Sequence, residues 1–181
     1  VSDRNNALTV LKNGNVGIDF SFPVYKLQLP NDPTDGIALA TAWSTYSDAR
    51  IKSTVENLKY GLKEILRLSP KSYIQHSGNF KDGNLEIGQE GTPSLGLIAQ
   101  ETYEVIPEAV VKPQNEHKAL WGVQYEKLIP VLINSIQELH IKNEKLDQKL
   151  KDLQIQNEQL LELQYKFEEL TNRLTDMESK S

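Results

Sequence analysis

The last third of the chain carries an apolar pattern that constrains its fold more than any other feature. From Tyr125 onward the sequence predicts one continuous helix, because Pro130 lies near its start, where a missing N–H costs least, and neither proline nor glycine follows. Apolar residues then recur alternately three and four positions apart, which is the spacing of a coiled-coil seam. Residues 128–181 are therefore predicted to form a coiled-coil helix that associates with copies of itself.

The seam can be assigned position by position. If Ile136 is at position a, the seam continues through Leu139, Asn143, Leu146, Leu150, Leu153, Asn157 and Leu160. Asparagine at a weakens an apolar seam but fixes its register, so the pattern favours a defined oligomer without choosing between dimer and trimer. After Leu160 the repeat slips by three residues, to Leu163, Phe167, Leu170, Leu174 and Met177, which is a stammer. The alternative is a single amphipathic helix packed on its own domain, which the length and narrowness of the stripe disfavour.

Composition excludes several classes of protein and of site. The net charge of −5 argues against a nucleic-acid binder, which needs a basic face to neutralise phosphates. No apolar run is long enough to predict a membrane-spanning helix. There are no cysteines, and His76, His117 and His140 are scattered. We therefore predict no disulfide, no metal site and no cofactor.

Residues 1–46 are rich in strand and turn patterns. Two short strands, at 7–11 and 16–18, are separated by Asn13-Gly14, which predicts a hairpin, and residues 25–29 alternate like a further strand. Few large apolar residues occur here, so the segment is expected to borrow neighbours, including other chains, to bury a core. It is interpreted as the end of a β-stranded stalk.

Residues 47–127 are predicted to form a small α+β domain. A capping-box pattern at 53–56 followed by apolar residues at helical spacing predicts a helix that Pro70 stops. The remaining expectations, in order, are a strand at 72–75, a hairpin with an exposed tip within 77–93, a buried strand at 95–99, a helix at 100–106 ended by Pro107, and strand pieces at 110–111 and 119–121. Trp43 and Trp121 are expected to be core or interface anchors rather than ligand platforms.

Three short motifs carry a family resemblance. They are Ser47-Asp48-Ala49-Arg50-Ile51-Lys52, then Gly-Leu-Ile-Ala-Gln-Glu at 96–101, then Tyr125 followed by Leu128, Ile129 and Pro130. Together, in this order, they resemble the C-terminal intramolecular chaperone domain of the peptidase S74 family, over residues 45–140. Members sit at the ends of phage tail spikes, endosialidases and neck appendages, and a related domain occurs in myelin regulatory factor. Residues 13–18 are also similar to repeats that precede this domain in fibre proteins.

The resemblance implies a fold, a reaction and a partner. It implies an elongated homotrimer with a β stalk fragment, a small α+β domain and a coiled-coil helix. This trimer would fold the upstream fibre or appendage domain of the same polypeptide and then release itself, with Ser47 as nucleophile, Lys52 as general base and a cut at Ser47-Asp48. The reaction would take place in the host cytoplasm during virion assembly. The stalk fragment would stay in the virion and the released chaperone would not.

The chemistry of this pair sets two conditions. A serine hydroxyl is a poor nucleophile until a base removes its proton, and a lysine serves as that base only if burial or a nearby cation favours its neutral form. Arg50 is the nearest candidate cation. Glu101 could line the cut site or cap a helix, and capping is the better interpretation. The alternative to a catalytic pair is that Ser47-Asp48 is only a turn or cap and that Lys52 is only a surface charge.

The position of the cut is itself a problem. Attack by a serine on the preceding carbonyl passes through a five-membered ring and would cut Tyr46-Ser47. Attack on its own carbonyl, to cut after Ser47, needs a strained four-membered ring. That cut therefore involves Asp48, a water or another subunit.

Two other functions stay open from the sequence. One is a permanent structural trimeriser that never cuts. The other is the self-cleaving domain of a regulatory factor, which an acidic chain that ends in a helix and has no transmembrane segment disfavours.

Overall fold

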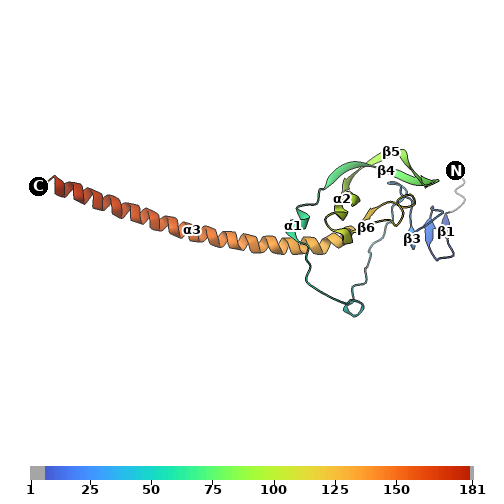
Figure 1. The fold of residues 1–181 in the computed structure, drawn as a ribbon, viewed down its shortest axis with the longest axis horizontal. Coiled ribbons are helices and arrows are strands. Elements are labelled where there is room, and N and C mark those ends of the chain that lie inside the picture. Colours follow the sequence, from blue (N-terminus) through green and yellow to red (C-terminus); the bar gives the residue numbers. More distant parts are fainter. Residues whose placement is uncertain (1–6, 180–181) are drawn as a thin grey trace.

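The computed structural model describes residues 7–179. It is an α+β chain with small sheets and a long C-terminal helix, as the sequence predicts. A body near the N-terminus carries the sheets and the short helices, and helix α3 (Leu128–Glu178) extends far beyond it (Figure 1). Within residues 7–179, no helix is both long enough and apolar enough to span a bilayer.

The N-terminal hairpin is confirmed. Strands β1 (Leu8–Val10) and β2 (Val16–Ile18) pair antiparallel, and Gly14 adopts φ +79° in the turn between them, a conformation that glycine tolerates best. Strand β3 (Leu27–Gln28) lies parallel to β2 and completes a three-stranded sheet. Buried Asn15 donates from its side-chain amide to the Pro23 carbonyl at 3.0 Å, which closes the loop between β2 and β3. Leu8 and Val10 of β1 are 61% and 65% exposed, so this sheet buries little apolar surface within the chain.

The hairpin of the α+β domain is longer than predicted. Strand β4 (Lys71–Lys81) pairs antiparallel with β5 (Asn84–Gly96), and a two-residue turn joins them. Asp82 and Gly83 both have positive φ, +50° and +78°, as a type I′ turn requires. The prediction of a buried strand at 95–99 is wrong, because β5 ends at Gly96 and Leu95 is 81% exposed. The apolar residues at 95–99 lie where the chain leaves the hairpin and do not form a central strand.

The predicted helix from the capping box at 53–56 is also wrong. Helix α1 covers only Leu62–Ile65, and residues 53–61 form neither helix nor strand. Thr54 has φ +52°, which no α-helix accepts, and Val55 and Leu58 remain 79% and 44% exposed. An amphipathic pattern stabilises a helix only where its apolar face is buried, and only the last turn of this segment reaches the body.

Short elements connect the hairpin to the long helix. They are α2 (Ala99–Tyr103), η2 (Pro107–Ala109), β6 (Val110–Val111), β7 (Gly122–Val123) and η3 (Tyr125–Lys127). The predicted helix at 100–106 is thus shorter, and Pro107 begins a 3-10 turn instead of ending that helix. The strand piece predicted at 119–121 lies just after, at β7, where it pairs with β6.

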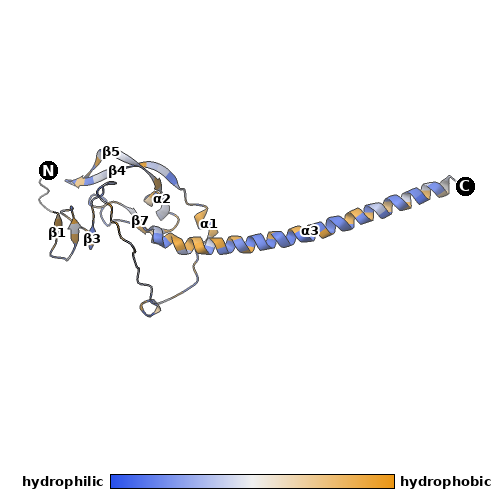
Figure 2. Ribbon diagram, turned by 180° about the vertical axis from the view of Figure 1, so that it is seen from behind, coloured by the Kyte–Doolittle hydropathy of each residue, from blue (hydrophilic) through white to orange (hydrophobic). Residues whose placement is uncertain are grey.

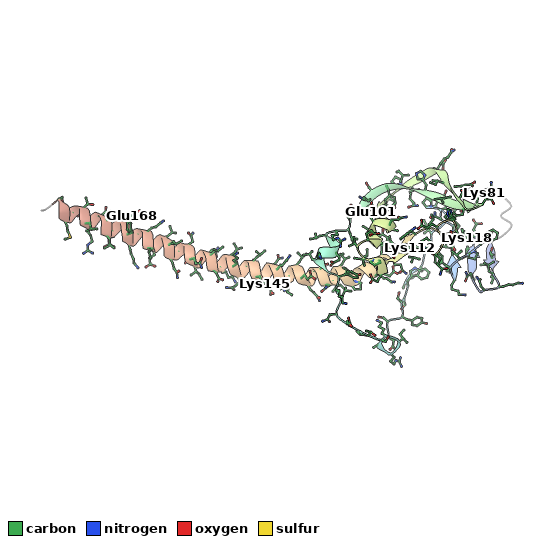
Figure 3. The ribbon with its side chains drawn as sticks, viewed as in Figure 1. Lys81, Glu101, Lys112, Lys118, Lys145 and Glu168 are labelled. Atoms are coloured by element: carbon green, nitrogen blue, oxygen red, sulfur yellow. The ribbon has the colours of Figure 1, made fainter. Side chains whose placement is uncertain are left out.

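Two interactions close this part of the body. The Tyr125 hydroxyl accepts a hydrogen bond from the Leu97 backbone N–H at 2.9 Å. Trp121 packs edge-on against Tyr103 with ring centroids 5.4 Å apart, and the Lys112 ammonium lies 5.0 Å from the centroid of each ring (Figure 3). Trp121 is therefore a packing anchor, as predicted.

The core lies where helix α3 meets the body. Its buried members are Ile106, Ala109, Leu128 and Val131, and the partly buried side chains around them are Tyr60, Ile65, Leu68, Leu97 and Val105. Ile106 is 2% exposed and Val131 is 2% exposed. A small apolar centre thus fixes the first turns of α3 against α1 and the segment that follows α2.

The first turns of α3 have two apolar faces. Leu128, Val131 and Ser135 are buried against the body, whereas Leu132 and Ile136, one position further round the helix, are 45% and 64% exposed. Beyond Glu138, every residue of α3 whose burial the structure describes is exposed. Apolar residues nevertheless recur along its whole length, as the repeated orange turns in Figure 2 show. Within residues 7–179, the predicted seam therefore has no partner.

Candidate functional site

The motif at 47–52 lies at the tip of a long segment that hangs away from the body. In Figure 1 this segment descends on the side of α3 opposite the hairpin and carries a single small coil, the 3-10 turn η1 (Ala49–Ile51). Asp48 is the N-cap of η1, and its carboxylate accepts from the Arg50 backbone N–H at 2.8 Å. The aspartate in the motif therefore has a local structural role, which is to start the turn.

The turn brings Ser47 and Lys52 together. The Lys52 ammonium Nζ donates a hydrogen bond to the Ser47 Oγ at 2.7 Å, although the residues are five positions apart. Both residues are exposed in the single chain. A serine and an amine in direct hydrogen-bond contact meet the geometric requirement for a nucleophile and its base.

Arg50 does not join this pair. Its guanidinium binds the Asp48 carboxylate through two nitrogens, with Nη2 to Oδ2 at 2.6 Å and Nε to Oδ1 at 3.0 Å. The side-chain hydrogen bond from Arg50, followed by the backbone one, holds the pKa of Asp48 below its ordinary value, and the same contact raises the pKa of Arg50. The cation that the sequence suggested beside Lys52 is therefore engaged by Asp48.

Glu101 lies in another part of the molecule. It is in the first turn of α2, where it makes no capping hydrogen bond, and its carboxylate is 3.6 Å from the Lys71 ammonium at the start of β4. Figure 3 places it on the body, on the far side of α3 from the segment that carries η1. In the single chain Glu101 ties α2 to the hairpin and is not brought to Ser47.

The downstream end of the motif's segment is held by residues that the sequence did not point to. The Asn134 side chain donates to the Tyr60 carbonyl at 2.8 Å, and Glu138 Oε2 accepts from the Leu62 backbone N–H at 3.1 Å. The Tyr60 hydroxyl also donates to Glu108 Oε2 at 2.9 Å, and this bond is the main reason that the pKa of Tyr60 is raised. These partners lie 48 to 76 positions apart in the chain, so no local pattern could reveal them.

The same segment exposes large apolar side chains on both sides of the motif. The exposed fractions are 98% for Leu39, 75% for Trp43, 93% for Tyr46, 70% for Ile51 and 79% for Val55. Water-exposed aromatic and aliphatic side chains in such number are unfavourable unless another surface covers them. Trp43, predicted as a core or interface anchor, is not in the core of the chain.

The described residues offer no metal site. No group of three or more histidine, aspartate or glutamate side chains in residues 7–179 could hold a metal ion. His76 is half-buried, and its Nδ1 lies 3.0 Å from the Gly88 carbonyl oxygen within the hairpin.

Comparison with known proteins gives one family. No curated protein matches the chain. A family model does, and its match covers residues 47–111, from Ser47 through the hairpin and α2 to the end of β6. The resemblance that the motifs carry is thus confirmed: residues 47–111 match the peptidase S74 family, the chaperone of endosialidase.

Proposed function

We propose that this chain is an intramolecular chaperone that assembles as a homotrimer, helps a fibre domain to fold and releases itself by cutting its own backbone at Ser47. The family match supports the chaperone role and a peptidase-related activity. The observation that carries the cleavage is the 2.7 Å contact between the Ser47 hydroxyl and the Lys52 amine. A pair of this kind is what a serine nucleophile requires, and it occurs at the first residue of the family match.

The proposed chemistry uses the dyad in its deprotonated form. A neutral Lys52 accepts the Ser47 proton as Oγ attacks a backbone carbonyl, and the resulting ammonium returns a proton to the leaving amine. An exposed amine is mostly protonated at neutral pH, so something must favour its neutral form. Since Arg50 is bound by Asp48, we attribute this to removal of water from the segment when the chains assemble.

The family implies a cut at Ser47-Asp48, and the geometry of attack restricts how that can happen. Within one chain, Ser47 Oγ reaches the Tyr46 carbonyl through a five-membered ring, and water would then open the resulting ester between Tyr46 and Ser47. A cut after Ser47 requires Asp48, the hydroxyl of another copy, or a water that Lys52 activates. The two routes leave fragments that differ by one serine, so the fragment mass identifies the bond.

Assembly is supported by how much surface a single chain leaves open. The chain exposes 15437 Å², whereas a folded monomer of this mass exposes about 8,900 Å². Leu146, Leu150 and Leu153 of the predicted seam are 58%, 57% and 50% exposed. In a coiled coil, such leucines are covered by the seam residues of the other helices, and the asparagines at position a fix the register. We propose three copies because the family resemblance implies a trimer.

The proposed partner is the upstream fibre or appendage domain of the same polypeptide. A trimeric β stalk has many long-range contacts and exposed strand edges, so it folds slowly and is prone to misassembly. A coiled coil forms from local contacts and brings three chains into register first. Cleavage would then leave the fibre kinetically trapped. We place these events in the host cytoplasm during virion assembly, with the stalk fragment kept in the virion.

The test is self-cleavage of the purified chain, followed by intact mass measurement. We expect two fragments that meet at Ser47, and no fragments from Ser47→Ala. Lys52→Ala should slow the reaction strongly. Ser53→Ala and Lys59→Ala, which change a serine and a lysine on the same segment, should cut like the unmodified chain. An intact mass of 20.5 kDa in a folded trimer of the unmodified chain would refute the proposal.

The exposure of Ser47 and Lys52 also favours a second candidate, a permanent trimeriser that never cuts. In that case the contact between them is a surface hydrogen bond. The same experiment separates the two functions, because a permanent trimeriser keeps its full mass with or without Ser47.

A further inference from the structure

We propose that Asn134 and Glu138 are positioning residues for the reaction at Ser47, because they fasten the segment that carries the dyad to helix α3. This inference rests on the proposed self-cleavage. It goes beyond it by assigning a role to two side chains on the helix that carries the predicted seam. We call Asn134, Glu138 and the backbone of 60–62 the clamp.

The clamp is built from hydrogen bonds between distant parts of the chain. Asn134 donates to the Tyr60 carbonyl at 2.8 Å, and Glu138 accepts from the Leu62 N–H at 3.1 Å. Asn134 and Glu138 are one turn apart on α3, and the Asn134 amide lies 3.5 Å from Glu138 Oε1. The Asn134 amide thus provides a donor for the Tyr60 carbonyl, and the Glu138 carboxylate provides an acceptor for the Leu62 N–H. Both groups lie at the start of α1, where a helix leaves its first N–H groups without partners.

Gly61 shows how closely the two parts approach. It is buried, and a Cβ atom built on it would collide with the Glu138 carboxylate. Its φ of −156° lies outside the positive range that favours glycine, and the atoms nearest to such a Cβ are those of the Glu138 carboxylate. The carboxylate of Glu138 therefore occupies the space that a side chain at position 61 would need.

The clamp is the first fixed point downstream of the dyad. Residues 53–59, between Lys52 and Tyr60, form neither helix nor strand, and the long-range hydrogen bonds of the segment begin at Tyr60. Eight residue steps reach at most roughly 29 Å. The position of the dyad relative to α3, and through α3 relative to the other copies, is therefore limited to this reach from the clamp.

A purely local role would be to cap helix α1, and the chain contains a matched control for it. Glu64 Oε2 accepts from the Gly61 N–H at 3.0 Å, so it caps the same helix end from within α1 and not from α3. If capping alone matters, Glu64→Ala and Glu138→Ala should slow cleavage alike. If fastening to α3 matters, only Glu138→Ala should.

The experiment measures the first-order rate of self-cleavage by intact mass, with circular dichroism and sedimentation confirming fold and assembly. We expect Glu138→Ala to slow cleavage by about tenfold or more, since small misplacements cost rate steeply. Glu64→Ala should stay within about threefold of the unmodified rate, because it leaves the reacting groups in place. Glu138→Gln keeps an acceptor oxygen for Leu62 and should restore most of the rate.

A second variant covers the case in which Glu138→Ala folds poorly. Gly61→Ala displaces the same carboxylate from the other side and should slow cleavage similarly, and adding it to Glu138→Ala should cost little more. Equal rates for Glu138→Ala and the unmodified chain, or equal slowing by Glu64→Ala, would overturn the clamp while leaving the self-cleavage intact. An unmodified chain that never cuts would instead refute the proposed function, and this inference with it.

Discussion

Leu153 and Ile155 provide a matched test of the predicted coiled-coil seam. Their side chains are similarly exposed in the single chain, but only Leu153 would be buried in the predicted assembly. They are 50% and 54% exposed and two positions apart on α3. Leu153 is at position d, inside the seam, whereas Ile155 is at position f, on the opposite face. Changing each to alanine therefore removes similar apolar surface from the same stretch of helix.

The expected magnitude follows from the exposed fraction. Burying a whole leucine side chain contributes about 1.5–3 kcal/mol, so burying the exposed half of Leu153 contributes about 0.8–1.5 kcal/mol per chain. Three chains meet at each layer of a trimer, which gives about 2.4–4.5 kcal/mol for the assembly. Leu153→Ala should therefore weaken the assembly equilibrium roughly 50- to 1,600-fold, and Ile155→Ala should leave it nearly unchanged.

Sedimentation equilibrium over a range of concentrations measures this directly. The unmodified chain and Ile155→Ala should sediment as the same oligomer, and Leu153→Ala should dissociate at higher concentration. Dissociation by both variants to the same extent would place the contact on another face of α3. No effect of Leu153→Ala would refute the seam and favour a single extended helix.

Three further predictions concern the body. Ile106→Ala should lower the free energy of unfolding by about 2–5 kcal/mol, since Ile106 is 2% exposed, and denaturant titration followed by Trp121 fluorescence would measure it. Gly83→Ala should cost about 1–2 kcal/mol in the same titration, because residue 83 has φ +78°. Glu108 raises the pKa of Tyr60, so this pair stabilises the fold below the ordinary tyrosine pKa and loses that contribution as pH rises through the raised value. Ultraviolet titration should show a late step from Tyr60, which Glu108→Gln moves to lower pH.

The sequence predicts best what local contacts decide. Helix α3 follows from spacing and from the absence of proline and glycine after Pro130. Both tight turns follow from residues that accept positive φ, at Gly14 and Gly83. The contact between Ser47 and Lys52 is also local, since it closes over a turn that Asp48 caps. The family motif drew attention to that pair, and the geometry is consistent with it.

What the sequence could not predict depends on distant partners. The apolar spacing from Val55 to Leu66 indicated a long helix, but the segment is bonded to α3 only from Tyr60 onward, and a helix forms only at Leu62–Ile65. Glu138, which accepts from the N–H of Leu62, lies 76 positions away. Neither apolar periodicity nor a capping box indicates whether the apolar face of a predicted helix will pack against another part of the protein.

The two apolar faces at the start of α3 have a further consequence for any assembly of this chain. Val131 and Ser135 fix the body on one side of the helix, while Leu132 and Ile136 present the seam about 100° further round the same turns. Both faces lie on the same continuous helix with no linker between them. The direction in which each body points from the axis of the assembly is therefore fixed by the helix itself. One residue inserted after Glu138 would keep the body and the clamp intact, yet turn them, with the segment that the clamp holds, by about 100° relative to the seam from Leu139 onward.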